Sequence, residues 1–368
     1  MPPPTQSKAF FTTLDAIRGV AAILVMMRHV PYFTSFQESY LAVDVFFLLS
    51  GVVIANAYEQ RLLQGLSIRR FTLMRIVRIY PLYLLGCALM LLALYQDGMP
   101  AWRPWLTMVA LAGLLLPNLA GDPPFPLNHP AWSLFFEMLA NIFYAAIVPW
   151  LNVRRLLILI TASGLGLGFT LLKSGQTSLD LGWSCATLGY GGLRVAYSFF
   201  AGVLLYRCFT AYGQPVVLFL ASRPGFRHNL PWLIVAAVSL ILMSRPGPAW
   251  RPAFDFIVVI AVFPPLIYLA LCLPKNIYGA PLARYLGLVS YPLYALHAPL
   301  HSLAVSFLEP WIDSDSPWLA LIFAGALLPL CSLLNRYFDA PVRRHLTAYA
   351  EAGYMRLGRL KTAPVQDQ

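Results

Sequence analysis

Long apolar stretches separated by short polar segments make up most of the chain between about residues 14 and 338. A helix needs about 20 predominantly apolar residues to cross a bilayer. Ten stretches meet or approach this length, and the pattern therefore predicts an all-α polytopic membrane protein with about ten transmembrane helices. The predicted spans are residues 14–33, 40–58, 76–95, 131–150, 155–173, 194–210, 230–244, 254–273, 287–308 and 317–338.

One further apolar run, Pro104–Pro117, is too short to cross easily, and the basic residues indicate how to place it. Cytoplasmic loops of membrane proteins are enriched in Lys and Arg. If this run does not cross, 19 of the 26 Lys and Arg residues fall in cytoplasmic segments and five in outer segments. If it crosses, Arg154 and Arg155 move to the outside. We therefore expect a re-entrant or interfacial helix here, with both termini in the cytoplasm of a protein of the inner membrane.

The same pattern predicts the domain organisation. A polar, Pro-rich segment, residues 1–13, precedes the first apolar run and does not resemble a cleavable signal. A single membrane domain is expected over residues 14–345. The polar residues 346–368 are expected to form a cytoplasmic tail.

Composition supports the membrane interpretation. Hydrophobic residues form 59% of the chain, charged residues 11%, and the mean hydropathy is +0.67. A soluble domain carries about 25% charged residues. A net charge of +11 would suggest nucleic acid in a soluble protein. Here the basic residues lie in short loops, so the expected partner is the lipid bilayer and no nucleic acid.

Charged side chains inside the first two predicted spans are costly, and such residues are functional candidates. Arg18 and His29 are 11 positions apart, which places them on one helical face and about 16 Å apart along the axis. Asp44 enters the second span at the depth of His29. An adjacent carboxylate can fix the tautomer of an imidazole, so an acid–base pair of His29 and Asp44 is one interpretation. There are two alternatives. Arg18 and His29 could simply extend to the inner and outer membrane surfaces, and His29 and Asp44 could form a purely structural ion pair.

The third, fourth and ninth predicted spans also carry charged or polar side chains. Arg75 and Arg78 share a helical face where the third span begins, and paired guanidinium groups suit phosphate oxygens. Glu137 lies one to two turns inside the fourth span, at the expected depth of His29. His297 lies in mid-span with Tyr294 three residues earlier. For Arg75 and Arg78 simple anchoring at the membrane surface is the alternative, and for His297 a structural hydrogen bond.

Together these segments resemble the acyltransferase family 3 membrane proteins over nearly the whole chain, from Leu14 to about Arg343. In the last motif Asp339 stands where the family more usually has Glu, and Asp339 and Arg343, four residues apart, are expected to form an ion pair. Six motifs follow the family's order: Leu14-Asp15-x-x-Arg18-Gly19 with His29; Val43-Asp44-Val45-Phe46-Phe47-Leu48-Leu49-Ser50-Gly51; Arg75-x-x-Arg78-Ile79-Tyr80-Pro81; Trp132-Ser133-Leu134-x-x-Glu137; Ser290-Tyr291-Pro292-Leu293-Tyr294-x-x-His297; and Asp339-x-Pro341-x-Arg343.

The resemblance implies an O-acyltransferase that takes an acyl group, most simply acetyl from acetyl-CoA, and uses no metal. The acceptor would be a hydroxyl of an extracytoplasmic or lipid-linked glycan, or of another compound. We expect Arg18, Arg75 and Arg78 to bind the donor phosphates, with His29 as catalytic base and Asp44 as its orienting partner. Four residues are expected to position the acceptor: Ser133, Glu137, Tyr294 and His297.

Two other functions fit parts of the pattern. A proton-coupled transporter would also use intramembrane His, Asp and Glu. However, the chain has no repeated halves with paired broken spans, and the arginine pair would then have no purpose. A succinyl- or longer-acyl transferase of the same family is equally compatible with the spacing. Direct transfer and an acyl-histidine intermediate also stay open.

Overall fold

The computed structural model describes residues 11–30, 36–96, 102–173, 175–274, 277–308 and 317–362. Within these residues the chain is helical and contains no strand. Four short 3-10 or π-helical turns join or interrupt the helices: η1 (Gln37–Leu41), η2 (Val148–Trp150), η3 (Val258–Val262) and η4 (Asn335–Asp339). The α-helices are α1 (Thr12–Arg28), α2 (Ala42–Leu63), α3 (Ile68–Gln96), α4 (Trp102–Gly113), α5 (Ala131–Ile147), α6 (Val153–Lys173), α7 (Leu188–Ala221), α8 (Pro224–Leu242), α9 (Arg251–Ile257), α10 (Phe263–Cys272), α11 (Ala280–Leu308), α12 (Pro317–Leu334) and α13 (Ala340–Thr362).

The all-α membrane fold expected from the hydrophobic pattern is confirmed. Seven helical segments of the described chain are long and apolar enough to cross a bilayer, and each of the ten predicted spans overlaps a helix. The count of ten stays a prediction, since α1 has only 17 residues and α8 has an apolar part, His228–Leu242, that is also short. The seven segments are Glu38–Leu63, Ile68–Gln96, Ala131–Trp150, Val153–Lys173, Leu188–Ala221, Arg251–Cys272 and Leu321–Ala352.

The short run near residue 104 forms α4, a helix of 12 residues. At a rise of 1.5 Å per residue it is about 18 Å long, whereas the hydrocarbon core is about 30 Å thick. It packs beside α3, where the Tyr83 hydroxyl donates to the Ala112 carbonyl. A helix of this length fits the expected re-entrant or interfacial segment, although its depth in the bilayer stays a prediction.

Close helix crossings hold the centre of the bundle together. At the crossing of α2 and α7, a Cβ at Gly51 would lie 2.0 Å from the Phe199 carbonyl oxygen, and one at Gly202 would lie 2.0 Å from that of Leu48. Only glycine permits this approach of two backbones, which is a common device of membrane helices. Helix α1 packs along α11, and α11 also packs on α3. These contacts fix α1, α2, α3 and α11 around one interior.

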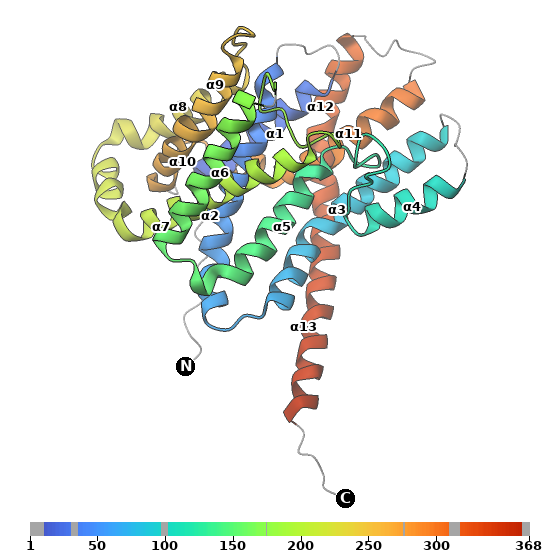
Figure 1. The fold of residues 1–368 in the computed structure, drawn as a ribbon, viewed down its shortest axis with the longest axis horizontal. Helices are drawn as coiled ribbons and strands as arrows, with labels where there is room; N and C mark the ends of the chain where they lie inside the picture. The colour runs from blue at the N-terminus through green and yellow to red at the C-terminus, as the bar shows by residue number, and fades with distance from the viewer. Residues whose placement is uncertain are drawn as a thin grey trace, which may run out of the picture.

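Several segments that were predicted to be cytoplasmic lie at one end of the bundle (Figure 1). The α2–α3 turn, the α5–α6 turn and the projecting α13 are all at the lower end of the view. The loop between α8 and α9 lies at the opposite end. The predicted topology requires these segments to lie at one end of the bundle.

Candidate active site

Most of the motif residues gather around three neighbouring cavities inside the bundle. The cavities extend from the start of α1, where Asp15 and Arg18 lie, to its end at His29. Neighbouring cavities share lining residues, so they form a series and not three unrelated hollows. We call them the arginine cavity, the middle cavity and the histidine cavity.

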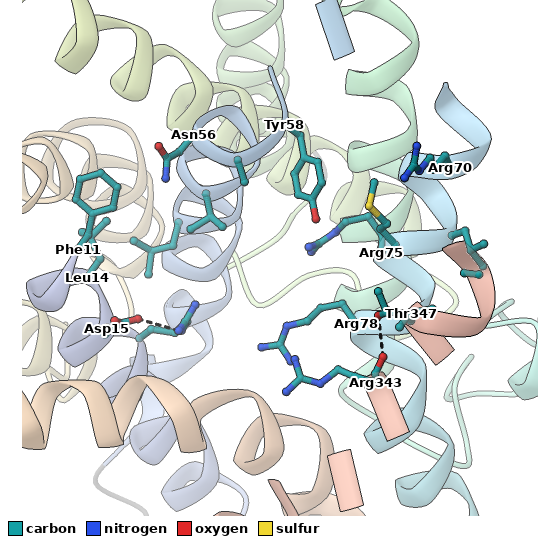
Figure 2. Close-up of a pocket in the computed structure, with 18 of the residues that line it drawn as sticks. Phe11, Leu14, Asp15, Asn56, Tyr58, Arg70, Arg75, Arg78, Arg343 and Thr347 are labelled. Atoms are coloured by element: carbon teal, nitrogen blue, oxygen red, sulfur yellow. Dashed lines mark hydrogen bonds and ion pairs between the residues drawn. The ribbon is translucent and has the colours of Figure 1, made fainter. Parts of the chain in front are cut away.

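The arginine cavity is the largest, with a volume of about 560 Å³. Helices α1, α2, α3 and α13 form its walls, with apolar and polar side chains between the charged ones. Figure 2 shows the Arg75, Arg78 and Arg343 side chains extending into the open space. Five arginines line the cavity: Arg18, Arg70, Arg75, Arg78 and Arg343.

Carboxylates hold four of these arginines in place. Arg18 pairs with Asp15 at 2.9 Å and also donates to the Gly287 carbonyl of α11 at 3.2 Å. Arg75 pairs with Glu137 of α5 at 3.2 Å. Arg78 and Arg343 both approach the same oxygen of Asp339, at 3.8 and 2.8 Å. These contacts confirm the expected pairing of Asp339 and Arg343.

The middle cavity is narrow, with a volume of about 150 Å³. Arg18, Arg75 and Arg78 line it as well as the arginine cavity. Its remaining wall is largely apolar and aromatic. The polar groups in it are Ser50, Ser133, Glu137, Ser290, Tyr291 and Tyr294.

The histidine cavity, of about 270 Å³, lies at the other end of α1 and shares Val43 and Tyr294 with the middle cavity. The exposed His29 lines it. An ion pair between Arg28 and Asp180, 2.6 Å long, forms another part of the wall. The remaining lining residues are Val25, Tyr40, His129, Pro130, Trp132 and Trp183. Such a cavity offers aromatic faces and hydrogen-bonding groups to a polar ligand.

Hydrogen bonds fix the tautomer of both motif histidines. The His29 Nδ1 atom lies 2.8 Å from the Val25 carbonyl oxygen, and the His297 Nδ1 atom lies 2.9 Å from that of Tyr294. Because a carbonyl can only accept, Nδ1 carries the proton in each ring and Nε2 has the free lone pair. The two ring centroids are 4.8 Å apart. His29 therefore presents a basic nitrogen that is oriented by its own helix.

The expected contact between Asp44 and His29 is wrong. Asp44 is buried and accepts from Arg194 of α7 at 2.5 and 3.3 Å, and from Ser198 at 3.3 Å. Arg194 is fully buried and also donates to the carbonyls of Tyr40 and Leu181. A buried carboxylate needs a charged partner, and the guanidinium group supplies a stronger one than an imidazole. Asp44 thus joins α2 to α7.

The expected depth of Glu137 is also wrong. Its Oε1 atom accepts from Arg75 at 3.2 Å and from the Ser50 hydroxyl at 2.7 Å, and it lines the middle cavity. Glu137 does not line the histidine cavity. Of the other expected positioning residues, Tyr294 lines the histidine cavity and the buried His297 stacks edge-on against His29. Ser133 lines the middle cavity, as Glu137 does, and its hydroxyl lies 2.6 Å from that of Tyr294.

Several residues of the cavities were not found from the sequence. Arg70, which belongs to none of the six motifs, lines the arginine cavity. Arg194, the first residue of the predicted span 194–210, is the buried partner of Asp44. His129 lines the histidine cavity from the loop before α5, and burial lowers its pKa, so that it is neutral at pH 7. A His three residues before Trp132 of the Trp-Ser-Leu motif was the available signal for His129.

Among the described residues no group of three or more His, Cys, Asp or Glu side chains could hold a metal ion. Helices crossing a membrane, with charged residues collected around linked interior cavities, define a multi-pass membrane protein with a buried polar site. The sequence model of the acyltransferase family 3 domain, described as "Acyltransferase domain", matches residues 11–336. The chain belongs to this family and is an acyltransferase, which decides against the transporter interpretation.

Two curated relatives illustrate the similarity. The chain is 42% identical over 154 residues to "Protein 2 in picA locus" of Rhizobium radiobacter, a match that covers 37% of the chain and 81% of the relative. It is 24% identical over 375 residues to the peptidoglycan O-acetyltransferase OatA of Listeria monocytogenes. That match covers 92% of the chain but 57% of the length of OatA. No solved structure matches the chain.

Proposed function

We propose that the protein transfers an acyl group, in the simplest case acetyl, from acyl-CoA at the arginine cavity to a hydroxyl group at the histidine cavity. The observation that carries the proposal is the series of cavities along α1. The arginine and middle cavities share three arginines, and the middle and histidine cavities share Val43 and Tyr294. A donor and an acceptor can therefore approach from opposite ends and meet inside the bundle.

The arginine cavity fits the donor by charge, size and shape. Arginine forks bind phosphate oxygens in two-point contacts, and five guanidinium groups line this space. A narrow, mostly apolar passage continues from it and suits a flexible arm with a thioester at its end. Acyl-CoA would supply the activated acyl group. The arginines of the cavity bind the phosphates of acyl-CoA, and the narrow passage directs its flexible arm towards His29.

At the histidine cavity we assign His29 the role of general base. Its Nε2 atom takes the proton of the acceptor hydroxyl while the hydroxyl oxygen attacks the thioester carbonyl carbon. The carbon–sulfur bond then breaks, and the leaving thiolate takes up the proton from the His29 imidazolium, which releases coenzyme A and restores the neutral His29. Ser133, Tyr294 and His297 support the acceptor and the His29 ring, and Glu137 positions Arg75 and Ser50 at the middle cavity.

The acceptor in this proposal is a glycan hydroxyl outside the cytoplasm. Aromatic residues and the Arg28–Asp180 pair line the histidine cavity, and aromatic faces with hydrogen-bonding groups are suited to sugar rings. The name of the Listeria relative supports the same acceptor class. With the arginine cavity open to the cytoplasm, the protein would lie in the inner membrane with both termini inside.

The topology can be checked with reporter fusions. Fusions after Leu66 and after His345 are expected to report a cytoplasmic location, because both positions belong to the predicted inner side, with its excess of basic residues. A fusion after Gln96, at the end of α3, is expected to report the outside. A cytoplasmic signal after Gln96 would overturn the orientation and place the arginine cavity outside.

The reaction can be tested in inside-out membrane vesicles that contain the protein. Radiolabelled acetyl-CoA added to the medium is expected to give an alkali-labile ester on glycan in the vesicle lumen, with release of one free thiol for each ester. Vesicles with the His29→Ala variant provide the background. Ester that accumulates on the outer face of the vesicles, or no thiol release at all, would contradict transfer across the membrane.

A further inference from the structure

We propose that Arg343, together with Arg78, binds a phosphate group of the donor, and that helix α13 is the wall of the arginine cavity that sets donor affinity. The inference rests on the proposed function and goes beyond it. The matched family region ends at residue 336, whereas α13 begins at Ala340. The residues that α13 adds to the cavity are Arg343, Thr347, Ala350 and Glu351.

The balance of charges around the cavity points to the Arg78–Arg343 pair. Arg18 has Asp15 as its own partner, and Arg75 has Glu137. Arg78 and Arg343, in contrast, share a single carboxylate oxygen of Asp339. One carboxylate neutralises one of the two guanidinium groups. The pair therefore keeps a net positive charge, and an anion that binds there lowers the repulsion between the two arginines.

The geometry exposes this charge to the cavity. Asp339 is fully buried, so it holds the two arginines from behind. Figure 2 shows their guanidinium groups side by side, directed into the open space. Two planar donors on one side of a cavity suit the oxygens of a phosphate group. Asp339 is thus a positioning residue, and the two arginines are the anion-binding residues.

The fold explains how α13 reaches this place. The π-helical turn η4 ends α12 and includes Asp339, which the wider turn places at the junction with α13. One turn later, Arg343 follows on the same face as Asp339. Arg344, the next residue, is exposed and does not line the cavity. Adjacent arginines on one helix therefore have different surroundings, which provides a matched control.

The test compares Arg343→Gln with Arg344→Gln in purified full-length protein, using acetyl-CoA and S-acetylpantetheine, which has no phosphate. Loss of one charge-assisted contact should lower kcat/KM for acetyl-CoA by about ten- to a hundredfold in Arg343→Gln. The value for S-acetylpantetheine should stay unchanged, and Arg344→Gln should behave as wild type with both donors. If Arg343→Gln does not fold, Arg343→Lys should give a smaller loss, again only with acetyl-CoA.

Each other outcome has a definite meaning. If Arg343→Gln uses acetyl-CoA as well as wild type, the residue does not bind the donor and the inference is wrong. Equal losses with both donors would show that α13 only supports the bundle, which also overturns the inference. If wild type uses neither donor, the acyl-CoA proposal itself fails, and this result is distinguishable because it appears without any substitution.

Discussion

Replacing His29 with alanine is expected to lower the rate of acyl transfer by about 10²- to 10⁴-fold, the usual effect of removing a general base. The His29 ring is held by the Val25 carbonyl and presents its Nε2 atom to the histidine cavity. No other basic nitrogen with a free lone pair lines that cavity except that of His129 in the loop before α5, as far as the described residues show. The measurement is ester formation at matched membrane levels of protein.

The control for this substitution is His228→Ala, because His228 is exposed on α8 and lies away from the three cavities. Acetyl-CoA binding should survive in His29→Ala, since the proposed phosphate site, the arginine cavity, lies at the other end of α1. Near wild-type turnover by His29→Ala would show that the proposed chemistry is wrong. His297, 4.8 Å away between ring centroids, would then be the next candidate.

Removing either partner of the Asp44–Arg194 pair is expected to destabilise the fold by about 3–5 kcal/mol, because the other charge is left buried and unpaired. Asp44→Ala and Arg194→Ala should therefore lower both the amount of protein in the membrane and its thermal midpoint in detergent. The double variant Asp44→Leu with Arg194→Met should recover much of the loss, because apolar residues replace both charges.

This prediction separates a structural role of Asp44 from a catalytic one. If the carboxylate acts mainly through α7, activity per folded molecule should fall much less in the double variant than in His29→Ala. A stable Asp44→Ala protein with the activity of His29→Ala would instead support a direct role in catalysis. That result would also support the acid–base pair of His29 and Asp44 that the sequence predicted.

The helical membrane fold was predictable because apolar runs of the required length are a strong signal. The motif residues were also found, since charged side chains inside such runs are rare. Their partners were not. Asp44 and Arg194 are 150 residues apart, and depth arguments alone cannot distinguish Arg194 from His29 as a partner for Asp44. The predicted span began at residue 194 and so placed this arginine at the outer end of a helix, whereas α7 begins at Leu188 and Arg194 lies inside it.

The position of Glu137 is the other main difference. The sequence placed Glu137 at the depth of His29, but it reaches Arg75 and Ser50 at the middle cavity. Glu137 lies well inside α5, which begins at Ala131, whereas His29 caps the end of α1, so the two residues are at different distances from the helix ends. The Asp339–Arg343 pair was correct because four residues along one helix fix the contact locally. Its place in the wall of the arginine cavity depends on packing between α13 and α3, for which the sequence has no signal.

The glycine crossing of α2 and α7 has an electrical consequence. A membrane enzyme with polar spaces at both ends of one helix must still hold back ions, since a unit charge that crosses the membrane gains or loses about 2.3 kcal/mol per 100 mV. At Gly51 and Gly202 backbone meets backbone, so no file of water can pass there. Val43 and Tyr294 line both the middle and the histidine cavities, and in the proposed reaction only an acyl group passes between these cavities. We therefore expect the close packing around this path to keep the bundle closed to ions during acyl transfer.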